Sequence, residues 1–253
     1  MRHYILEETN WKHLKERKIE LAILPWGATE AHNYHLPYST DVIESNYISH
    51  EAARKAYEKG ADIIVLPTVP FGVNTGQTDI LLDINIYPST QLAILHDIIE
   101  VLNRQGINKL LILNSHGGND FKPILRELGV KFPNMFLTLC NWYSTVNKEK
   151  YFDNSGDHAD EMETSIMLNI APELVLPLNE SGFGIEKKIK IKGIKEGFAW
   201  TERKWSKVTN DTGIGNPKKA SSEKGEIFLE DLTNQLSDLL IEICNADLNN
   251  LYE

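Results

Sequence analysis

The sequence predicts an α/β fold, a three-layer α/β/α arrangement with a mostly parallel central sheet, forming a single domain over residues 1–253. Two observations and one general rule predict it. Short apolar segments rich in β-branched residues alternate with amphipathic segments of helical spacing up to residue 141. Alternating strands and helices favour a parallel sheet that is covered by helices on both faces. No internal repeat, low-complexity tract or linker divides the chain.

The apolar segments are the predicted strands, and the predicted helices lie between them. The strands cover residues 19–25, 61–69, 109–114 and 134–141. Residues 41–59 carry an apolar stripe with a period of 3.6 residues, and Gly60 follows where a C-terminal cap is expected. Residues 89–105 repeat this pattern and are closed by Gly106. A further helical pattern follows the strand at 109–114.

The second half of the chain is less regular. Residues 161–170 indicate a short helix that Pro172 ends. Residues 222–245 indicate a long amphipathic helix that we expect to pack on the sheet. Its apolar side consists of Ile227, Leu229, Leu232, Leu236, Leu239, Leu240 and Ile243. In residues 185–194 lysine alternates with isoleucine, which favours a half-exposed strand over an anion-binding patch.

Composition excludes several classes of function. The chain has 26 Lys and Arg against 36 Asp and Glu, so its formal charge is −10. Nucleic acid and anionic membranes are therefore not expected as main partners, because both are bound through positive surfaces. No apolar run reaches the about 18 residues of a membrane span, and the N-terminal segment is charged, so we expect a cytoplasmic protein. Cys140 and Cys244 lie in apolar runs, as reduced buried thiols do.

The first chemically informative stretch is LPWGATEAHNYHLPYSTD, residues 24–41. It starts at the carboxyl end of the first predicted strand, where open α/β sheets build their sites. Glu30 and His32 are two residues apart, so both side chains leave the same face of an extended segment. Asp41 follows at the start of the next helix. A loop of this length can bring three potential ligands together.

The second stretch is LLILNSHGGND, residues 110–120. A strand of buried type runs directly into His116, which we expect to face the site. Gly117 and Gly118 allow close approach of the backbone and present amide groups near a helix start, so we expect them to contact substrate.

The third stretch is GDHADEMETS, residues 156–165. His158 and Glu161 are i, i+3 neighbours. Asp157, Asp160, Glu161 and Glu163 would repel one another unless solvent or a cation neutralised some of them. Buried carboxylates need such a partner.

Together these stretches supply three histidines with several carboxylates and no thiolate. Such ligands suit Zn²⁺, Mn²⁺ or Fe²⁺, and a bridging carboxylate suits two ions. Two ions about 3.5 Å apart can hold a hydroxide and polarise a carbonyl for hydrolysis. Each residue also has a structural alternative: Glu30 as a helix cap, and His32 or His35 as a surface loop residue. The metal hypothesis depends on three separate segments placing ligand types where strands end.

At these residues the sequence resembles the creatininase, or creatinine amidohydrolase, family. Residues 24–41 look like that family's first motif, NSHGGN at 114–119 is similar to the second, and HADEMETS at 158–165 looks like the third. Asp160 stands where a glycine is usual. A weaker match, GIGNP at 213–217 followed by Ala220 and EKG at 223–225, extends the similarity to about residue 225.

The resemblance implies a homohexamer with two divalent metal ions per chain that hydrolyses a non-peptide C–N bond through a metal-bridged hydroxide. By motif position, Glu30 and His116 would hold one ion, His32 the other, and Asp41 would bridge them. Creatininase itself has a glutamate ligand where this chain has Gly118. Relatives with the glycine pair carry an extra carboxylate in the third motif, so the resemblance assigns Glu161 as the missing ligand, with Glu163 as the alternative.

The resemblance also implies catalytic roles, with His158 matching a histidine that assists proton transfer beside Glu161. Two positions indicate a substrate other than creatinine. Gly117 stands where creatininase has a tyrosine, and Asn154 lies near the position of that enzyme's pocket tryptophan. Trp142 is expected to line the pocket, although a core position is an equal alternative. The leading hypothesis is an amidohydrolase for a small cyclic amide or a formamide.

Two other classes of function compete with this hypothesis. An inactive metal- or small-molecule-binding member of the fold is suggested by Gly118. A nucleotide-binding module using residues 116–118 is weaker, because neither a GxGxxG nor a Walker pattern occurs.

Overall fold

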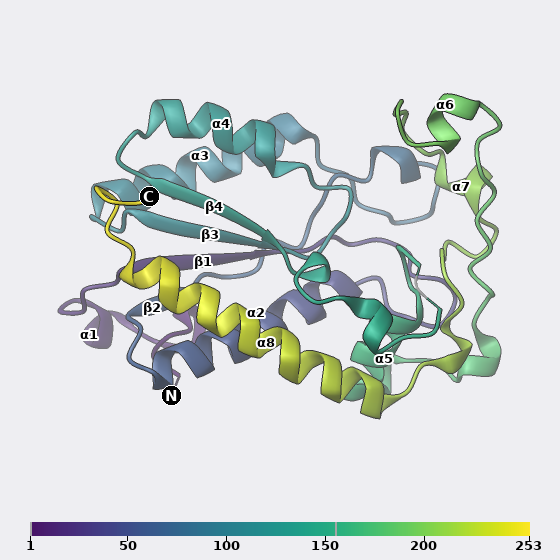
Figure 1. Ribbon diagram of the computed structural model, residues 1–253, viewed down its shortest axis with the longest axis horizontal. Helices are drawn as coiled ribbons and strands as arrows, with labels where there is room; N and C mark the ends of the chain where they lie inside the picture. Colours follow the sequence, from purple (N-terminus) through teal and green to yellow (C-terminus); the bar gives the residue numbers. More distant parts are fainter. Residues whose placement is uncertain (1, 155) are drawn as a thin grey trace.

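The computed structural model describes residues 2–154 and 156–253 and contains a four-stranded parallel sheet with helices on both faces (Figure 1). The strands are β1 (Leu21–Trp26), β2 (Ile63–Val65), β3 (Lys109–Asn114) and β4 (Phe136–Asn141), in the order β2-β1-β3-β4. Each pair is parallel, with Ile23 opposite Val65 and Leu111, and Asn114 opposite Asn141. The predicted α/β class is confirmed. Each strand lies within its predicted segment, except that β1 extends one residue further, to Trp26; β2 covers only Ile63–Val65 of the predicted residues 61–69.

The α-helices occupy segments before, between and after the strands. They are α1 (Trp11–Leu14), α2 (Thr40–Glu58), α3 (Pro88–Arg104), α4 (Phe121–Lys131), α5 (Glu161–Ile170), α6 (Lys192–Lys195), α7 (Trp205–Val208) and α8 (Ser222–Asn245). Short 3-10 helices are η1 (Leu6–Glu8), η2 (Thr75–Gln77), η3 (Trp142–Ser144), η4 (Lys148–Lys150), η5 (Pro172–Leu174), η6 (Leu178–Glu180) and η7 (Pro217–Lys219).

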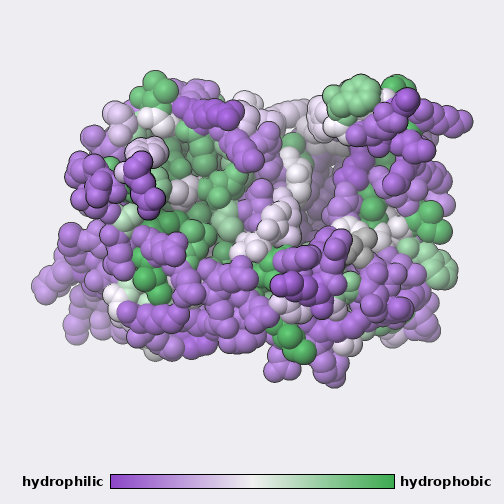
Figure 2. Space-filling model, viewed as in Figure 1, coloured by the Kyte–Doolittle hydropathy of each residue, from purple (hydrophilic) through white to green (hydrophobic). Residues whose placement is uncertain are grey.

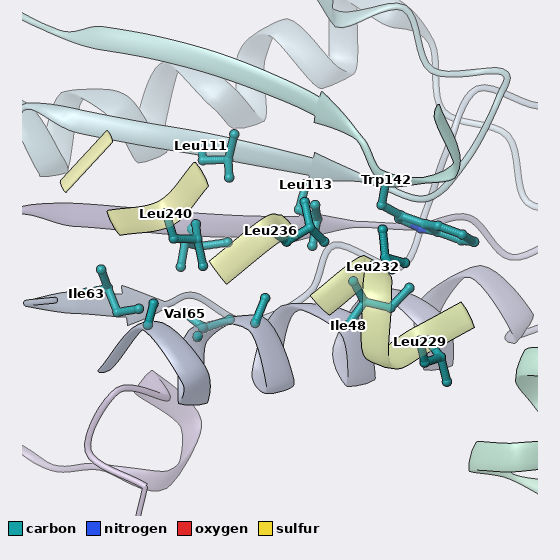
Figure 3. Close-up of a cluster of buried hydrophobic side chains, with 14 of the residues drawn as sticks. Ile48, Ile63, Val65, Leu111, Leu113, Trp142, Leu229, Leu232, Leu236 and Leu240 are labelled. Carbon is teal, nitrogen blue, oxygen red and sulfur yellow. The ribbon is translucent and has the colours of Figure 1, made fainter. Parts of the chain in front are cut away.

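Two apolar cores lie on the two faces of the sheet. On one face, α2 and α8 pack on side chains such as Ile23, Ile63 and Leu111. Figure 3 shows the leucines of α8 reaching this face, with Leu240 near Ile63 and Leu232 near Ile48. On the other face, α3 and α4 pack on Leu24, Ile112 and their neighbours. Residues alternate between the faces along each strand, which is why both cores are apolar.

The two helices predicted for the second half of the chain are found. The helices predicted at 161–170 and 222–245 are confirmed with the same boundaries. Ile227 is the exception on the predicted apolar side of α8, since it is 60% exposed while Phe228 is buried.

The strand predicted at residues 185–194 is wrong. The segment is irregular and leads into the short helix α6, in an arm that extends away from the sheet (Figure 1). The arm lies beyond the carboxyl ends of the strands, so among the described residues no strand of the sheet lies beside it. The alternation of lysine with isoleucine therefore does not mark a sheet face: Ile185 and Ile191 are 69% and 63% exposed, and the lysines between them are exposed too.

Both cysteines are free, with Cys244 buried and Cys140 partly buried. Among the helices that the structure describes, none is both long enough and apolar enough to cross a membrane.

Candidate metal centre

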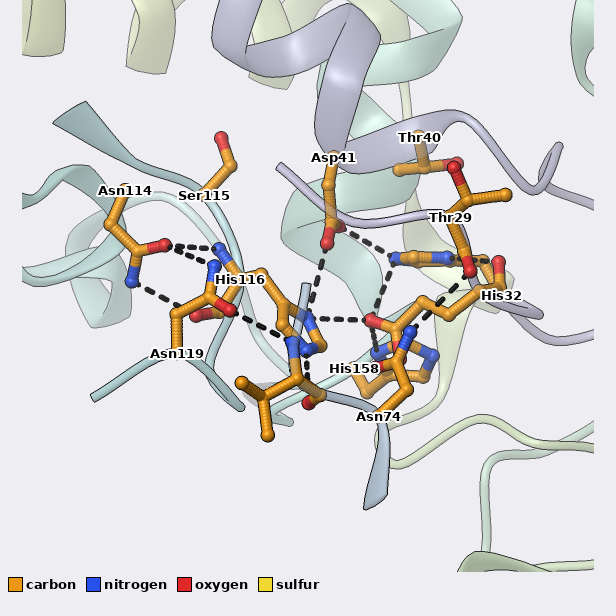
Figure 4. A network of polar contacts seen from close by, with 12 residues as sticks. Thr29, His32, Thr40, Asp41, Asn74, Asn114, Ser115, His116, Asn119 and His158 are labelled. Atoms are coloured by element: carbon orange, nitrogen blue, oxygen red, sulfur yellow. Dashed lines mark hydrogen bonds and ion pairs between the residues drawn. The ribbon is translucent and has the colours of Figure 1, made fainter. Parts of the chain in front are cut away.

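The three motif stretches meet at the carboxyl ends of β1 and β3, close to the first turns of α2 and α5 (Figure 4). Glu30 and His32 follow β1, His116 follows β3, and Asp41 lies in the first turn of α2. Parallel strands end at the same edge of the sheet, which brings their following residues together. Gly27 permits this approach, because a Cβ there would lie 2.9 Å from the backbone nitrogen of Val42.

Asp41 lies between two histidines. Its Oδ1 is 3.0 Å from His32 Nε2, and its Oδ2 is 3.2 Å from His116 Nδ1. Glu30 Oε1 is 2.9 Å from His116 Nδ1 and 3.6 Å from His158 Nδ1. All five residues are at most 6% exposed. The structure thus gathers the carboxylates and imidazoles of three distant segments in one buried place.

Each of the three histidines is oriented by a backbone carbonyl on its outer side. His32 Nδ1 lies 3.1 Å from the carbonyl oxygen of Glu30, His116 Nε2 lies 3.1 Å from that of Val73, and His158 Nε2 lies 2.8 Å from that of Ala31. A carbonyl only accepts, so the outer nitrogen carries the hydrogen. In the neutral ring the inner nitrogen then presents a lone pair toward the carboxylates.

Lone pairs that face carboxylate oxygens need a cation between them, and this arrangement is the one that metal-binding histidines adopt. Ligand atoms within 4.8 Å of one another form three groups: Glu30 with Asp41 and His116, His32 with Asp41 and Glu163, and Glu30 with His32 and His158. His32 Nε2 and Asp41 Oδ2 are buried and have no hydrogen-bond partner among the described residues. The donor set therefore fits divalent ions.

The pKa values of the cluster follow from burial and from the mutual proximity of its charges. Burial opposes ionisation of Glu30, but His116, His158 and His32 outweigh it and lower its pKa. Burial likewise opposes the charge on His32, yet Asp41 raises the pKa of the imidazole to about 10. Burial, helped by Asp160 and Asp41, raises the pKa of Glu163 to about 8 although His32 lowers it. Without a cation, the cluster therefore holds extra protons in place of metal charge.

The structure separates the two glutamates of the third motif. Glu161 turns away from the cluster: its carboxylate lies 2.5 Å from Lys224 Nζ and accepts hydrogen bonds from the backbone and side-chain nitrogens of Asn154. Glu163 lies with His32 and Asp41, and its carboxylate accepts a hydrogen bond from the backbone nitrogen of Ala159. The sequence prediction of Glu161 as ligand and catalytic residue is therefore not supported by its position, and its alternative, Glu163, is the residue brought to the cluster.

Other residues of the third motif position this helix. Asp160 accepts hydrogen bonds from the backbone nitrogens of Met162 and Glu163 as the N-cap of α5. Ala159 adopts a left-handed conformation with φ of 49°, which is uncommon for a residue with a Cβ and lies at a turn between His158 and the helix. His35 lies outside the cluster, with Nε2 2.9 Å from Thr164 Oγ1.

A cavity of about 550 Å³ opens onto the cluster, and the predicted substrate-contacting glycines line it. Figure 2 shows a hollow with hydrophilic walls beside the arm that carries α6 and α7. Gly117 has free space at its Cβ position. At Gly118 a Cβ would lie 2.5 Å from His116 Nε2 and would also clash with the Val73 carbonyl, so a side chain here would displace His116.

The structure does not bring Trp142 to the cavity. Trp142 is fully buried in the core beneath β4, and its Nε1 donates to Ser115 Oγ. The adjacent residue, Tyr143, lines the cavity in its place. The two positions cannot be told apart by sequence, because the chain leaves β4 directly into η3 and neighbouring residues then point in different directions.

Several wall residues were not anticipated. Asn74 and Gln77 lie in the segment after β2, and Trp200, Arg203 and Trp205 lie in the arm. Their segments carry no ligand-type motif. The only sequence signal was two tryptophans in an otherwise polar stretch, which alone does not indicate a site.

Fold and site together define a class: a parallel α/β protein with a buried cluster of histidines and carboxylates, of a composition that fits divalent cations, at the carboxyl ends of its strands. The comparison with protein families narrows this class. Residues 7–240 match the creatininase family, described as creatinine amidohydrolase. The chain belongs to the creatininase family.

Individual relatives agree with this assignment. A solved Bacteroides fragilis protein, provisionally named a creatinine amidohydrolase, is 42% identical over the full length of both chains, with a TM-score of 0.93. A solved creatininase is 20% identical over 96% of this chain and 99% of its own, with a TM-score of 0.79, which shows the shared fold. A Methanothermus fervidus protein is 25% identical over 223 residues, covering 83% of this chain and 81% of that protein; it is named 2-amino-5-formylamino-6-ribosylaminopyrimidin-4(3H)-one 5'-monophosphate deformylase.

Proposed function

We propose that this protein is a metal-dependent amidohydrolase that cleaves a non-peptide C–N bond of a small cyclic amide or a formamide. One observation carries the proposal: three buried histidines each use one nitrogen on a backbone carbonyl and aim the other at buried carboxylates. The family match and the deformylase relative support hydrolysis of such a bond.

Two ions would be held by the two ligand groups that share Asp41. Glu30, Asp41 and His116 would hold one, and His32, Asp41 and Glu163 the other. Glu163 would thus provide the carboxylate ligand for which creatininase has a glutamate at the position of Gly118. When bound, such ions polarise an amide carbonyl and lower the pKa of water, which is the chemistry that amide hydrolysis needs.

His158 is the proposed proton carrier. Its Nε2–H donates to the Ala31 carbonyl, so the lone pair of Nδ1 faces the Glu30 carboxylate, 3.6 Å away, and His158 lines the cavity. Burial and the nearby His32 lower the pKa of His158, which keeps the ring neutral and able to accept a proton near pH 7. It would take a proton from the attacking water and pass this proton to the leaving nitrogen as the C–N bond breaks.

The substrate could be creatinine-like or a formamide, and two positions bear on the choice. Gly117 leaves open space where creatininase has a tyrosine, and Asn154 holds Glu161 where that enzyme has a pocket tryptophan. These differences favour a substrate other than creatinine. The deformylase relative makes formamides the first compounds to test.

The test is a metal add-back assay. Protein treated with chelator should lose hydrolysis of formamides and cyclic amides, and Zn²⁺ or Mn²⁺ should restore it. These ions are chosen because solved creatininases of similar fold are named as Zn-Zn and Mn types. Full activity after complete metal removal would show the proposal to be wrong. Two bound ions without turnover of any amide would instead favour the inactive binding protein.

A matched pair of histidine variants tests the proton carrier. His158→Asn should lower kcat by about a hundredfold or more while both ions remain bound. The control, His96→Asn, changes a half-exposed histidine on α3 and should leave kcat unchanged.

The family resemblance also leads us to propose a homohexamer. Sedimentation equilibrium of the purified protein would give six chains per particle, whereas a monomer would contradict the proposal.

A further inference from the structure

The arm carries a basic segment in an otherwise acidic chain. Residues 185–195 contain five lysines and one glutamate, whereas the whole chain has a formal charge of −10. Lys188, Lys190 and Lys195 are exposed, and none of them forms an ion pair within residues 2–154 and 156–253. Three positive charges are therefore available to carboxylates outside the arm.

The same arm exposes apolar side chains. Ile185 and Ile191 lie on either side of three of the lysines and are largely exposed, and Phe198 further along the arm is 78% exposed. Figure 2 shows hydrophobic side chains beside hydrophilic ones on the arm, at the upper right. Apolar side chains gathered at the surface and surrounded by charges are typical of protein–protein contact sites. A partner must therefore offer both carboxylates and apolar surface.

A groove formed mainly by α2 and α8 offers both. Its walls include Tyr47 of α2 and Glu226, Ile227, Glu230 and Asp231 of α8, and its volume is about 550 Å³. Ile227 is the exposed residue on the otherwise apolar side of α8. Glu230 and Asp231 lie three and four positions after Ile227, so the three side chains share one face of the helix. The groove thus presents an isoleucine among carboxylates.

Two carboxylates of the groove have no cation. Glu51 and Glu230 are each paired with a basic residue of α2. Glu226 and Asp231 form no ion pair in the described part of the chain, although Asp231 accepts a hydrogen bond from the Tyr151 hydroxyl. The groove is therefore negative where the arm is positive, and each surface has exposed isoleucine at its charged region.

Within one chain the two surfaces do not meet. Figure 1 shows α6 of the arm at the top of the molecule and the first turns of α8 at the bottom. No described residue of the arm lines the groove. A second copy of the chain brings a groove to the arm without needing any other partner.

We infer that the arm of one copy binds in the α2–α8 groove of a second copy, with lysines of the arm on Glu226 and Asp231 and an isoleucine of the arm on Ile227. Such a contact joins two unlike surfaces, so it closes either as a reciprocal pair or as a ring. The inference goes beyond the proposed hydrolysis. It supplies a contact for the proposed assembly but does not require six copies.

The contact would also affect the cavity. Trp200 and Arg203 lie on the same arm and line the cavity that opens onto the metal centre. A second copy that holds the arm would therefore hold this wall of the cavity in place.

Charge reversal on either surface tests the contact, by sedimentation velocity of the purified protein over a range of concentrations. Lys188→Glu with Lys190→Glu should lower the association constant by about tenfold or more, because like charges would then face one another. Glu226→Lys with Asp231→Lys should have the same effect for the same reason. All four changes combined should restore association to within about threefold of the wild type, because opposite charges face one another again.

A matched control reverses two lysines elsewhere. Lys12→Glu with Lys122→Glu changes the net charge by the same amount, and both lysines are exposed and lie outside the arm and the groove. Association should be unchanged in this variant. Far-UV circular dichroism should match the wild type in every variant, since all the altered side chains are exposed.

Several results would overturn the inference. Wild-type protein that stays monomeric at every concentration would contradict it, and so would a combined variant that stays dissociated. An assembly of six chains that neither reversal weakens would support the proposed hexamer and contradict this contact. If the arm variant instead lost binding to phosphatidylserine vesicles with its assembly unchanged, the arm would bind anionic membranes and the inference would be wrong. Failure of the metal add-back assay would contradict the proposed function but leave assembly unchanged, so the two failures can be told apart.

Discussion

Two fully buried regions of this protein differ in what holds them together. The core between the sheet and α8 consists of residues such as Ile63, Leu236 and Leu240, and burial alone stabilises it. The cluster at the carboxyl ends of β1 and β3 is equally buried, yet it consists of three histidines and three carboxylates. Side chains of that kind are stable in an interior only when their charges are compensated.

The comparison shows that the residues that stabilise the fold and the residues that fit a metal ion lie at different places along the sheet. The apolar core is complete within the chain, whereas the cluster retains orphaned atoms at His32 and Asp41 that a cation would satisfy. Changes in the core should therefore alter unfolding and leave metal binding intact, whereas changes in the cluster should alter metal binding. Each of the following predictions tests that separation.

The largest effect is expected from Asp41→Asn. This variant keeps the shape of the residue but removes the charge that both ligand groups share. Hydrolysis should fall by about a thousandfold or more, because neither ion would be held correctly, and elemental analysis should find fewer than two ions per chain. Wild-type metal content in this variant would contradict the shared role of Asp41.

The pH dependence of the metal-free protein should be the next largest effect. The pKa of His32 rises from 6.5 to about 10 on folding, so its contribution is fully present below pH 6.5 and is lost as pH rises through about 10. The raised pKa of Glu163, about 8, acts with the same sign. Urea unfolding should show a loss on the order of 4 kcal/mol between pH 6.5 and pH 10.

Metal-loaded protein is the control for this pH dependence. Bound ions require neutral imidazoles and ionised carboxylates, so the loss at high pH should disappear. An unchanged pH profile after metal loading would mean that the cluster does not bind the ion.

Leu240→Ala tests the apolar region. Leu240 lies at the far end of the core from the cluster, beside Ile63 (Figure 3). Truncation should lower the free energy of unfolding by about 3 kcal/mol, through lost burial and the cavity left behind. Metal stoichiometry and KM should stay at their wild-type values; a change in either would show that the two regions are coupled.

The smallest expected effect separates the two glutamates of α5. Glu163→Gln should weaken binding of the second ion by about 10- to 100-fold, a loss typical of altered metal sites. Glu161→Gln is its matched control on the same helix, and it should leave both ions in place, because Glu161 pairs with Lys224. Loss of an ion in Glu161→Gln but not in Glu163→Gln would mean that Glu161 is the ligand.

The sequence predicts the regular parts of the fold well, for identifiable reasons. Helices α5 and α8 have strong boundary signals. Asp160 and Ser221 cap their N-terminal ends, and Pro172 follows the last turn of α5. The arm is predicted wrongly at 185–194, since alternation cannot show whether a neighbouring strand exists. Strand pairing depends on residues far away in sequence.

The same limit applies to the site. Glu30, His32, Asp41, His116 and His158 come together, and each is recognisable because it follows a strand or lies at or just before the start of a helix. Which glutamate of α5 joins them depends on the rotation of that helix about its axis, which is fixed by packing against α2 and α8. Choosing between neighbours such as Trp142 and Tyr143 likewise requires the direction of the backbone after β4.

Anomalous X-ray diffraction from crystals grown with Zn²⁺ would test the metal centre most directly. We predict two peaks that share Asp41, one with Glu30 and His116 and the other with His32 and Glu163, at ligand distances of about 2.0–2.2 Å. Crystals in which these side chains hold no zinc, with Asp41 in contact with His32 and His116 alone, would contradict it.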